Sequence, residues 1–132
     1  ASYWRSLLTD RSGPAKEREF AQLADKTQHI VFSKTMSTVD WANTRIAKDL
    51  ETKIALLKKQ PGKNIVAWGG ATLAAALINS RLVDEYRLVL NPTLLGGGRA
   101  LFNNLQGRER LQLIGSLPMS SGNIVLTYRP DK

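Results

Sequence analysis

The sequence has no cysteine and a single histidine, His29, among its 132 residues. Without cysteine the chain forms neither disulfides nor thiolate metal sites, and one imidazole excludes most zinc sites. We therefore expect no bound metal and interpret His29 as a structural residue. The absence of disulfides is compatible with a reducing, cytoplasmic location, which we expect for this chain.

Long apolar runs are also missing from the sequence. No stretch approaches the roughly 18 residues that cross a bilayer, and no signal-peptide pattern opens the chain. We therefore expect a soluble protein without a membrane partner. With 42% hydrophobic and 23% charged residues, the composition is typical of one globular domain, which we assign to residues 1–132.

The net charge of +8 suggests nucleic-acid binding, but the distribution of the charges does not favour it. Basic residues are spread along the chain among eleven acids, and no aromatic residues are interleaved with them. We expect no nucleic-acid partner, and interpret the charge as a solvated face that steers small anions. The one modest concentration of charge comprises Lys48, Lys53, Lys58, Lys59 and Lys63.

The stretch from Asn64 to Leu77 organises the rest of the chain. Its apolar run Ile65–Trp68 predicts a short strand buried on both faces, and the helix-forming residues after Gly69-Gly70 predict a helix over 71–78. A strand, a glycine turn and a helix together form an anion site, because free amides at the helix start point outward at the positive end of the helix dipole.

Gly69-Gly70 alone leaves two interpretations open. The pair could be a tight turn that binds nothing, or a place where a ligand approaches the backbone closely. The three-glycine fingerprint of dinucleotide-binding Rossmann folds is absent, because Leu73 stands three positions after Gly70. Any nucleotide site here therefore differs from the standard Rossmann one.

A second polar segment, Ser33-Lys34-Thr35, directly follows a strand predicted over 28–32. In α/β sheets ligands bind outside the carboxyl ends of the strands, so this triplet would share an edge with Gly69-Gly70 if the two strands are parallel neighbours. Two hydroxyls and an ammonium group suit a phosphate. A solvated turn is the alternative.

The remaining elements follow from the same periodicities. Adjacent Asp84 and Glu85 cannot jointly face one substrate from a strand, so we treat them as boundary residues. Strands that alternate with helices and then form a hairpin predict a mixed sheet with helices on both faces. The predicted elements are a helix over 17–25, a very short strand at 44–46, a helix capped by Asp49 that ends before Pro61, a strand over 86–90, and strands over 111–117 and 123–128.

Several of these segments together resemble the reductase domain of bacterial riboflavin-biosynthesis enzymes and its dihydrofolate-reductase-like relatives. The likeness covers most of the chain and implies a three-layer α/β/α sandwich whose mixed, mostly parallel sheet ends in an antiparallel hairpin. It also implies an NADPH-dependent reductase and a homodimer. The segments that carry it are Val31–Thr35, Pro61–Lys63, Trp68–Leu73, Leu82–Leu88, Asn91-Pro92 with the glycine loop and Leu101-Phe102, and the closing strand to Tyr128.

The resemblance implies positions for the cofactor, but it leaves the catalytic residues unknown. The turn after the central strand holds the cofactor pyrophosphate in the family, and the polar triplet after the earlier strand approaches its adenosine end. The implied cofactor-binding residues are Ser33, Lys34, Thr35, Gly69, Gly70, Ala71, Thr72, Leu73 and Ala74.

Two features depart from the family pattern. The residue before the glycine turn is a carboxylate that binds the pyrimidine substrate in the riboflavin-pathway reductases, whereas here it is Trp68. An aromatic ring at this position favours stacking on a flat heterocyclic substrate or on the nicotinamide. Family members also begin with a strand and a loop that cover the nicotinamide, so we expect these 132 residues to lack such an N-terminal segment. A non-catalytic nucleotide-binding or dimerising domain remains the alternative.

Overall fold

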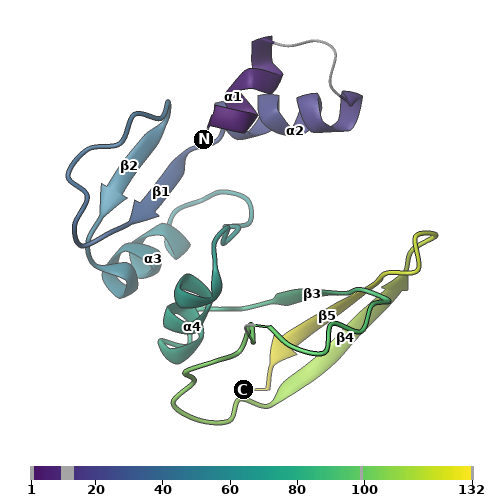
Figure 1. Ribbon diagram of the computed structural model, residues 1–132. Coiled ribbons are helices and arrows are strands. Elements are labelled where there is room, and N and C mark those ends of the chain that lie inside the picture. The colour runs from purple at the N-terminus through teal and green to yellow at the C-terminus, as the bar shows by residue number, and fades with distance from the viewer. Residues whose placement is uncertain (1, 10–13, 99, 132) are drawn as a thin grey trace. The chain divides into compact units, whose positions relative to one another are not determined.

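A computed structural model describes residues 2–9, 14–98 and 100–131, with side chains from Ser6 onward. The chain divides into two compact units, Ala1–Lys53 and Ile54–Lys132, and each is described by itself. Figure 1 labels the elements, which are α1 (Ser2–Thr9), α2 (Ala15–Lys26), β1 (His29–Phe32), β2 (Thr44–Ala47), α3 (Leu50–Lys58), α4 (Ala71–Asn79), β3 (Tyr86–Leu90), β4 (Leu111–Pro118) and β5 (Ile124–Pro130).

The first unit is a helix pair followed by a parallel strand pair. α1 packs against α2, and Leu7 and Ala21 are buried on these helices. β1 and β2 run parallel, with His29 opposite Thr44 and Phe32 opposite Ala47. The carboxyl ends of both strands therefore lie at the same edge of this two-stranded sheet.

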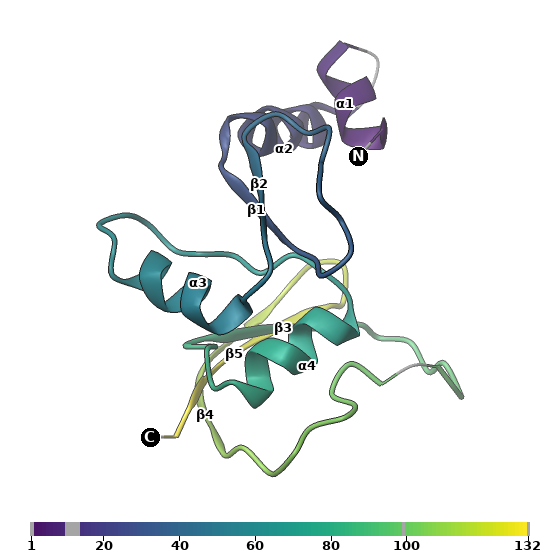
Figure 2. The same cartoon turned by 90° about the vertical axis from the view of Figure 1, so that its left-hand side faces the viewer.

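The second unit contains an antiparallel sheet with the strand order β3-β5-β4. Six residues separate the end of α4 from the start of β3. Figures 1 and 2 show α4 close to the start of β3, and its residues Ala75, Leu77 and Ile78 are buried. A β-bulge interrupts β4, since Leu113 lies opposite Tyr128 and Gly115 lies opposite Thr127. Ile114 is therefore the additional residue of the bulge.

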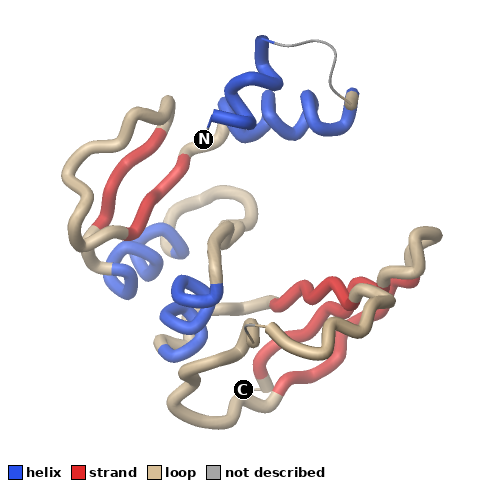
Figure 3. Tube along the Cα trace, in the orientation of Figure 1, coloured by secondary structure: helices blue, strands red, loops and turns tan. Residues whose placement is uncertain are grey.

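The predicted central strand over Ile65–Trp68 is wrong. The whole segment between α3 and α4 is a loop (Figure 3), and Val66 and Trp68 are 75% and 74% exposed. A strand exists only where a neighbour pairs with its backbone, and no strand in the described part of the chain pairs with this segment. The sequence predicted one mixed sheet, whereas the structure has the parallel pair β1-β2 and the antiparallel sheet β3-β5-β4.

The other predicted elements are present, with boundaries that shift by a residue or two. Asp49 accepts a hydrogen bond from the Thr52 amide (3.3 Å), as expected of a cap before α3. Bonds from the side chain and amide of Thr52 hold the pKa of Asp49 below its ordinary value. α1 was not predicted from the sequence.

Among the helices described in residues 2–9, 14–98 and 100–131, none is both long and apolar enough to span a bilayer.

Candidate functional site

The start of α4 offers backbone donors without a side-chain cap. Gly70 is the N-cap residue and provides no capping side chain, and the first helical bond runs from the Ala74 amide to the Gly70 carbonyl (3.2 Å). The amides of Ala71, Thr72 and Leu73 precede that bond, so they have no acceptor one turn back in the helix. They lie at the positive end of the helix dipole, where an anion is stabilised.

The two glycines before α4 differ in what a side chain would meet. A Cβ at Gly69 would lie 2.8 Å from Leu73 Cδ2, whereas a Cβ at Gly70 would meet no atom within 4 Å. Gly70 has an extended backbone (φ −82°, ψ −178°) that any residue adopts. Local packing therefore accounts for Gly69, while the space beside Gly70 is open to a ligand.

Ala74 and Trp68 bracket this turn. The Ala74 amide is already bonded within the helix, so contact between Ala74 and a ligand would come from its methyl group. Trp68 directly precedes the turn and is largely exposed. Its ring is thus accessible to a flat ligand.

The polar triplet lies at the carboxyl end of β1, as predicted. The Ser33 amide donates to the Ala47 carbonyl (3.2 Å), which continues the parallel pairing with β2, and Ser33 Oγ accepts from the Met36 amide (3.1 Å). Lys34 and Thr35 are exposed. The expectation that the triplet shares a sheet edge with Gly69-Gly70 depended on a strand over Ile65–Trp68 beside β1. That strand is absent and β1 pairs with β2, so this expectation loses its premise.

Lys48 is a residue that the sequence reasoning missed. The sequence reasoning counted it only as part of a modest concentration of charge, but it directly follows β2, and β2 ends beside β1. Among the described residues neither Lys34 nor Lys48 forms an ion pair. The only sequence signal was its position after a short predicted strand. That position places Lys48 near the end of β1 only because β1 and β2 are parallel.

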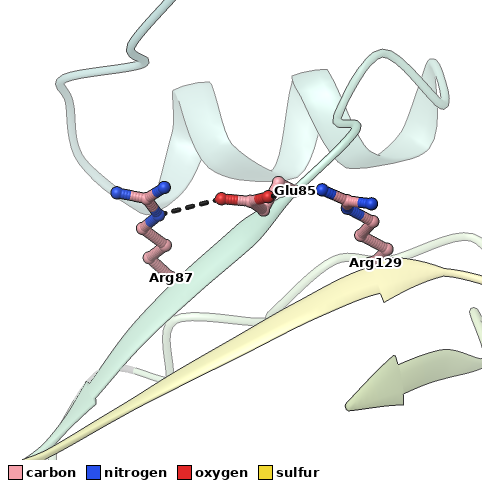
Figure 4. A network of polar contacts seen from close by, with 3 residues as sticks. All are labelled: Glu85, Arg87 and Arg129. Atoms are coloured by element: carbon pink, nitrogen blue, oxygen red, sulfur yellow. Dashed lines mark hydrogen bonds and ion pairs between the residues drawn. The ribbon is translucent and has the colours of Figure 1, made fainter. Parts of the chain in front are cut away.

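Asp84 and Glu85 have separate partners, in agreement with their interpretation as boundary residues. Asp84 pairs with Lys58, whereas Glu85 lies between Arg87 (2.9 Å) and Arg129 (3.3 Å), as Figure 4 shows. The hydrogen bonds from Arg87 and then Arg129 lower the pKa of Glu85. A carboxylate held in this way is an ion-pair acceptor rather than a proton donor at neutral pH.

His29 is engaged in structural contacts. Its Nε2 lies 2.7 Å from the Ala24 carbonyl, and its ring makes a T-shaped contact with the Trp41 ring at a centroid distance of 6.0 Å. The described residues contain no group of three or more metal-ligating side chains placed to share an ion.

Comparison with known proteins identifies related sequences. The sequence pattern of the RibD C-terminal domain matches residues 4–125. Two uncharacterized proteins of Bacillus subtilis (strain 168) are similar to the chain: YyaP is 34% identical over 125 residues, and YwjB is 32% identical over 92 residues. The matches cover 95% and 70% of this chain, and 66% and 53% of those two proteins.

A solved structure confirms the fold. The crystal structure of a putative riboflavin biosynthesis protein from Shewanella sp. PV-4 matches 99% of this chain and 70% of its own chain, with a TM-score of 0.68 and 24% sequence identity. The fold is thus α/β and dihydrofolate-reductase-like, as the sequence predicted, although the sheet differs in the details given above.

Proposed function

The chain belongs to the RibD C-terminal domain family, and we propose that it is an NADPH-dependent reductase acting on a small, flat heterocycle. We propose further that residues 1–132 work as one reductase domain. The chain spans 66% and 53% of the two curated relatives, so the activity of the whole protein is part of this proposal.

The uncapped start of α4 is the observation that supports the proposal most directly. The amides of Ala71, Thr72 and Leu73 lack helical acceptors, and the space beside Gly70 is open. A pyrophosphate has oxygens that can accept hydrogen bonds from these amides, and the positive end of the helix dipole stabilises its negative charge. The residues present therefore fit the phosphate portion of NADPH.

We assign the adenosine end of the cofactor to the carboxyl edge of the β1-β2 pair. Ser33 and Thr35 provide hydroxyls there, and Lys34 provides an ammonium group that suits the 2′-phosphate. Lys48 follows the neighbouring strand and adds a second cation at this edge. Two cations at one edge favour NADPH over NADH.

NADPH, when bound, supplies the hydride, and the protein binds and orients both reactants. The exposed ring of Trp68, next to the phosphate-binding turn, is suited to stack on the substrate or on the nicotinamide. A carboxylate there would bind a pyrimidine by hydrogen bonds, so Trp68 indicates recognition by ring shape. By holding the ligand ring in place, Trp68 would lower the entropy cost of the reaction.

The test is a titration with NADPH, followed by NADPH oxidation in the presence of dihydrofolate, riboflavin or a substituted pyrimidine. Gly70→Val places a branched side chain where the pyrophosphate would approach, and its Cβ meets no protein atom within 4 Å. We expect this variant to fold and to lose NADPH affinity.

Gly107→Val is the matched control. A Cβ there also meets nothing within 4 Å, and Gly107 lies in the loop that Asn79 at the far end of α4 holds through the Gln106 amide (3.0 Å). This variant should bind NADPH as the wild type does. Unchanged affinity in folded Gly70→Val would remove the assignment, and binding without turnover of any substrate would favour a non-catalytic nucleotide-binding domain.

We also propose a homodimer. Val89 on β3 and Leu117 on β4 both lie opposite Val125 on β5, so the three side chains form one apolar row across the sheet. Val89 and Leu117 are 55% and 63% exposed. An exposed apolar row on a sheet of a small domain favours association with a second copy.

A further inference from the structure

The first unit contains a hollow at the opposite edge of the β1-β2 pair from Ser33, Lys34 and Thr35. Its volume is about 280 Å³. It lies where both parallel strands begin, whereas the polar triplet lies where β1 ends. It is therefore separate from the residues proposed for the adenosine end of the cofactor. The residues that line it are Lys26, Gln28, Trp41, Asn43, Thr44 and Arg45.

Hydrogen bonds hold the walls of this hollow in place. The His29 amide donates to the Asn43 carbonyl (2.8 Å), and Asn43 Nδ2 donates to the Asp25 carbonyl (2.8 Å) at the end of α2. Asn43 has a positive φ of 54°, a conformation that asparagine tolerates better than most residues. These bonds fix the start of β2 against the end of α2, so the site is largely formed before any ligand binds.

The indole of Trp41 forms one wall and is also supported. It makes a T-shaped contact with the His29 ring, and His29 Nε2 donates to the Ala24 carbonyl (2.7 Å). Trp41 is nevertheless 38% exposed, so part of its ring is available to a ligand. A supported, partly open indole is a suitable surface for a planar ring.

Two cations, Lys26 and Arg45, line the same hollow. Within residues 2–9, 14–98 and 100–131, neither Lys26 nor Arg45 forms an ion pair. The amide side chain of Gln28 and the hydroxyl of Thr44 add polar groups to the walls. Lys and Arg bind phosphate and carboxylate oxygens through charge-assisted hydrogen bonds, and the guanidinium does so with two parallel donors.

We propose that this hollow binds a small anion carried on a planar ring, with Lys26 and Arg45 holding the anionic group and Trp41 holding the ring. The volume supports the size of this ligand. Pockets for small molecules are typically about 300 to 1,000 Å³, so this one suits a single ring with one anionic group and is too small for a dinucleotide. The inference does not depend on the proposed reductase activity.

Phenyl phosphate and benzoate are suitable probes, because they carry two different anions on the same ring. Calorimetry on the full chain should show saturable binding of at least one of them, and their relative affinity identifies the preferred anion. Inorganic phosphate should bind more weakly than phenyl phosphate, because it cannot contact Trp41. Phosphate binding as tight as phenyl phosphate, or no saturable binding of either probe below about 10 mM, would overturn the proposal.

Substitutions then locate the binding. Lys26→Ala and Arg45→Ala should each weaken the preferred probe about tenfold or more, because each removes a charge-assisted hydrogen bond. Trp41→Leu should weaken the probe but leave inorganic phosphate unchanged. Lys16→Ala, an exposed lysine on the same helix as Lys26, controls for the loss of one positive charge.

Probe affinity that falls in Lys34→Ala but not in Lys26→Ala or Arg45→Ala would instead place the probe at the edge proposed for the cofactor, and would overturn the proposal. Circular dichroism and thermal unfolding confirm that each variant is folded. Probe affinity that is unchanged in folded Lys26→Ala and Arg45→Ala, or that falls equally in Lys16→Ala, would show that the hollow is not the binding site.

Discussion

The hydroxyl of Tyr86 donates a hydrogen bond of 2.6 Å to Oε2 of Glu109. Tyr86 is a buried residue at the start of β3, and Glu109 comes from the loop before β4. Together with Ile78 and Leu111 they line an apolar hollow of about 190 Å³. This bond therefore joins a long loop to the buried side of the sheet.

The first prediction concerns the stability that this bond provides. Tyr86→Phe keeps the buried ring and removes only the hydroxyl, so urea unfolding should show a loss of about 1.5 kcal/mol, the lower end of the range for a hydrogen bond to a charged group. Tyr128→Phe is the control, because Tyr128 lies directly opposite Tyr86 on β5. An equal loss in both variants would argue against a special role for the Glu109 bond.

The second prediction is an alkaline pH dependence. Burial raises the pKa of Tyr86 above its ordinary value, and the bond to Glu109 raises it further. The folded protein thus retains this proton at a pH where the unfolded chain loses it. The stabilising contribution is complete below the unfolded pKa of about 10 and decreases as the pH rises above it. Wild type should therefore lose more stability than Tyr86→Phe above about pH 10 in urea unfolding.

The third prediction concerns acid and Glu85. Arg87 and Arg129 lower the pKa of Glu85, so its contribution to stability is present above its unfolded pKa and is lost as the pH falls through the lower folded value. Thermal unfolding from neutral pH to acid should show a smaller loss for Glu85→Gln than for the wild type. Parallel curves for the two proteins would mean that the exposed ion pairs contribute nothing measurable.

The fourth prediction addresses cofactor preference. Lys34→Ala should narrow the preference for NADPH over NADH about tenfold or more, because a charge-assisted bond to the 2′-phosphate contributes roughly 1.5 to 3 kcal/mol. We expect Lys48→Ala to act in the same direction. Fluorescence titrations with both cofactors measure the ratio, and Lys16→Ala should leave it unchanged. If Lys34→Ala retains the full preference, Lys34 is only a surface charge.

The fifth prediction concerns association. Light scattering at micromolar concentration should give the mass of a dimer for the wild type. Leu117→Lys, which places a charge in the apolar row with Val89 and Val125, should give a monomer. Ser116→Lys is the control, because Ser116 lies opposite Leu126 on the other face of the sheet. A monomeric wild type would contradict the proposal.

Local sequence patterns predicted the helices and strands whose own residues strongly favour one conformation. Alternation gave β3 at Tyr86–Leu90 with the observed bounds, and helix formers after Gly70 gave α4. By contrast, Ile65–Trp68 is as apolar as a buried strand, but burial also needs a neighbouring strand, which a local pattern does not report. The eight-residue α1 depends on packing against α2 and escaped prediction for the same reason.

In the candidate site, too, the sequence predicted the local features but not those that depend on contacts between distant residues. Gly69-Gly70 was recognised as a turn before a helix, but the sequence could not separate the two glycines. Only the distance to Leu73 Cδ2 shows that packing limits Gly69, whereas the space beside Gly70 is open. Lys48 was missed because its position at the β1 edge depends on parallel pairing between strands separated by an eleven-residue connection.

The bulge in β4 also determines which changes of length this sheet tolerates. Because Ile114 has no partner on β5, a relative that lacks this one residue keeps Leu113 opposite Tyr128 and Gly115 opposite Thr127. A deletion at Ser116 would instead shift the register of one end of the strand by one residue, so that its side chains would move to the opposite face of the sheet. The bulge thus gives β4 one position where a residue can be gained or lost while the other residues keep their partners on β5.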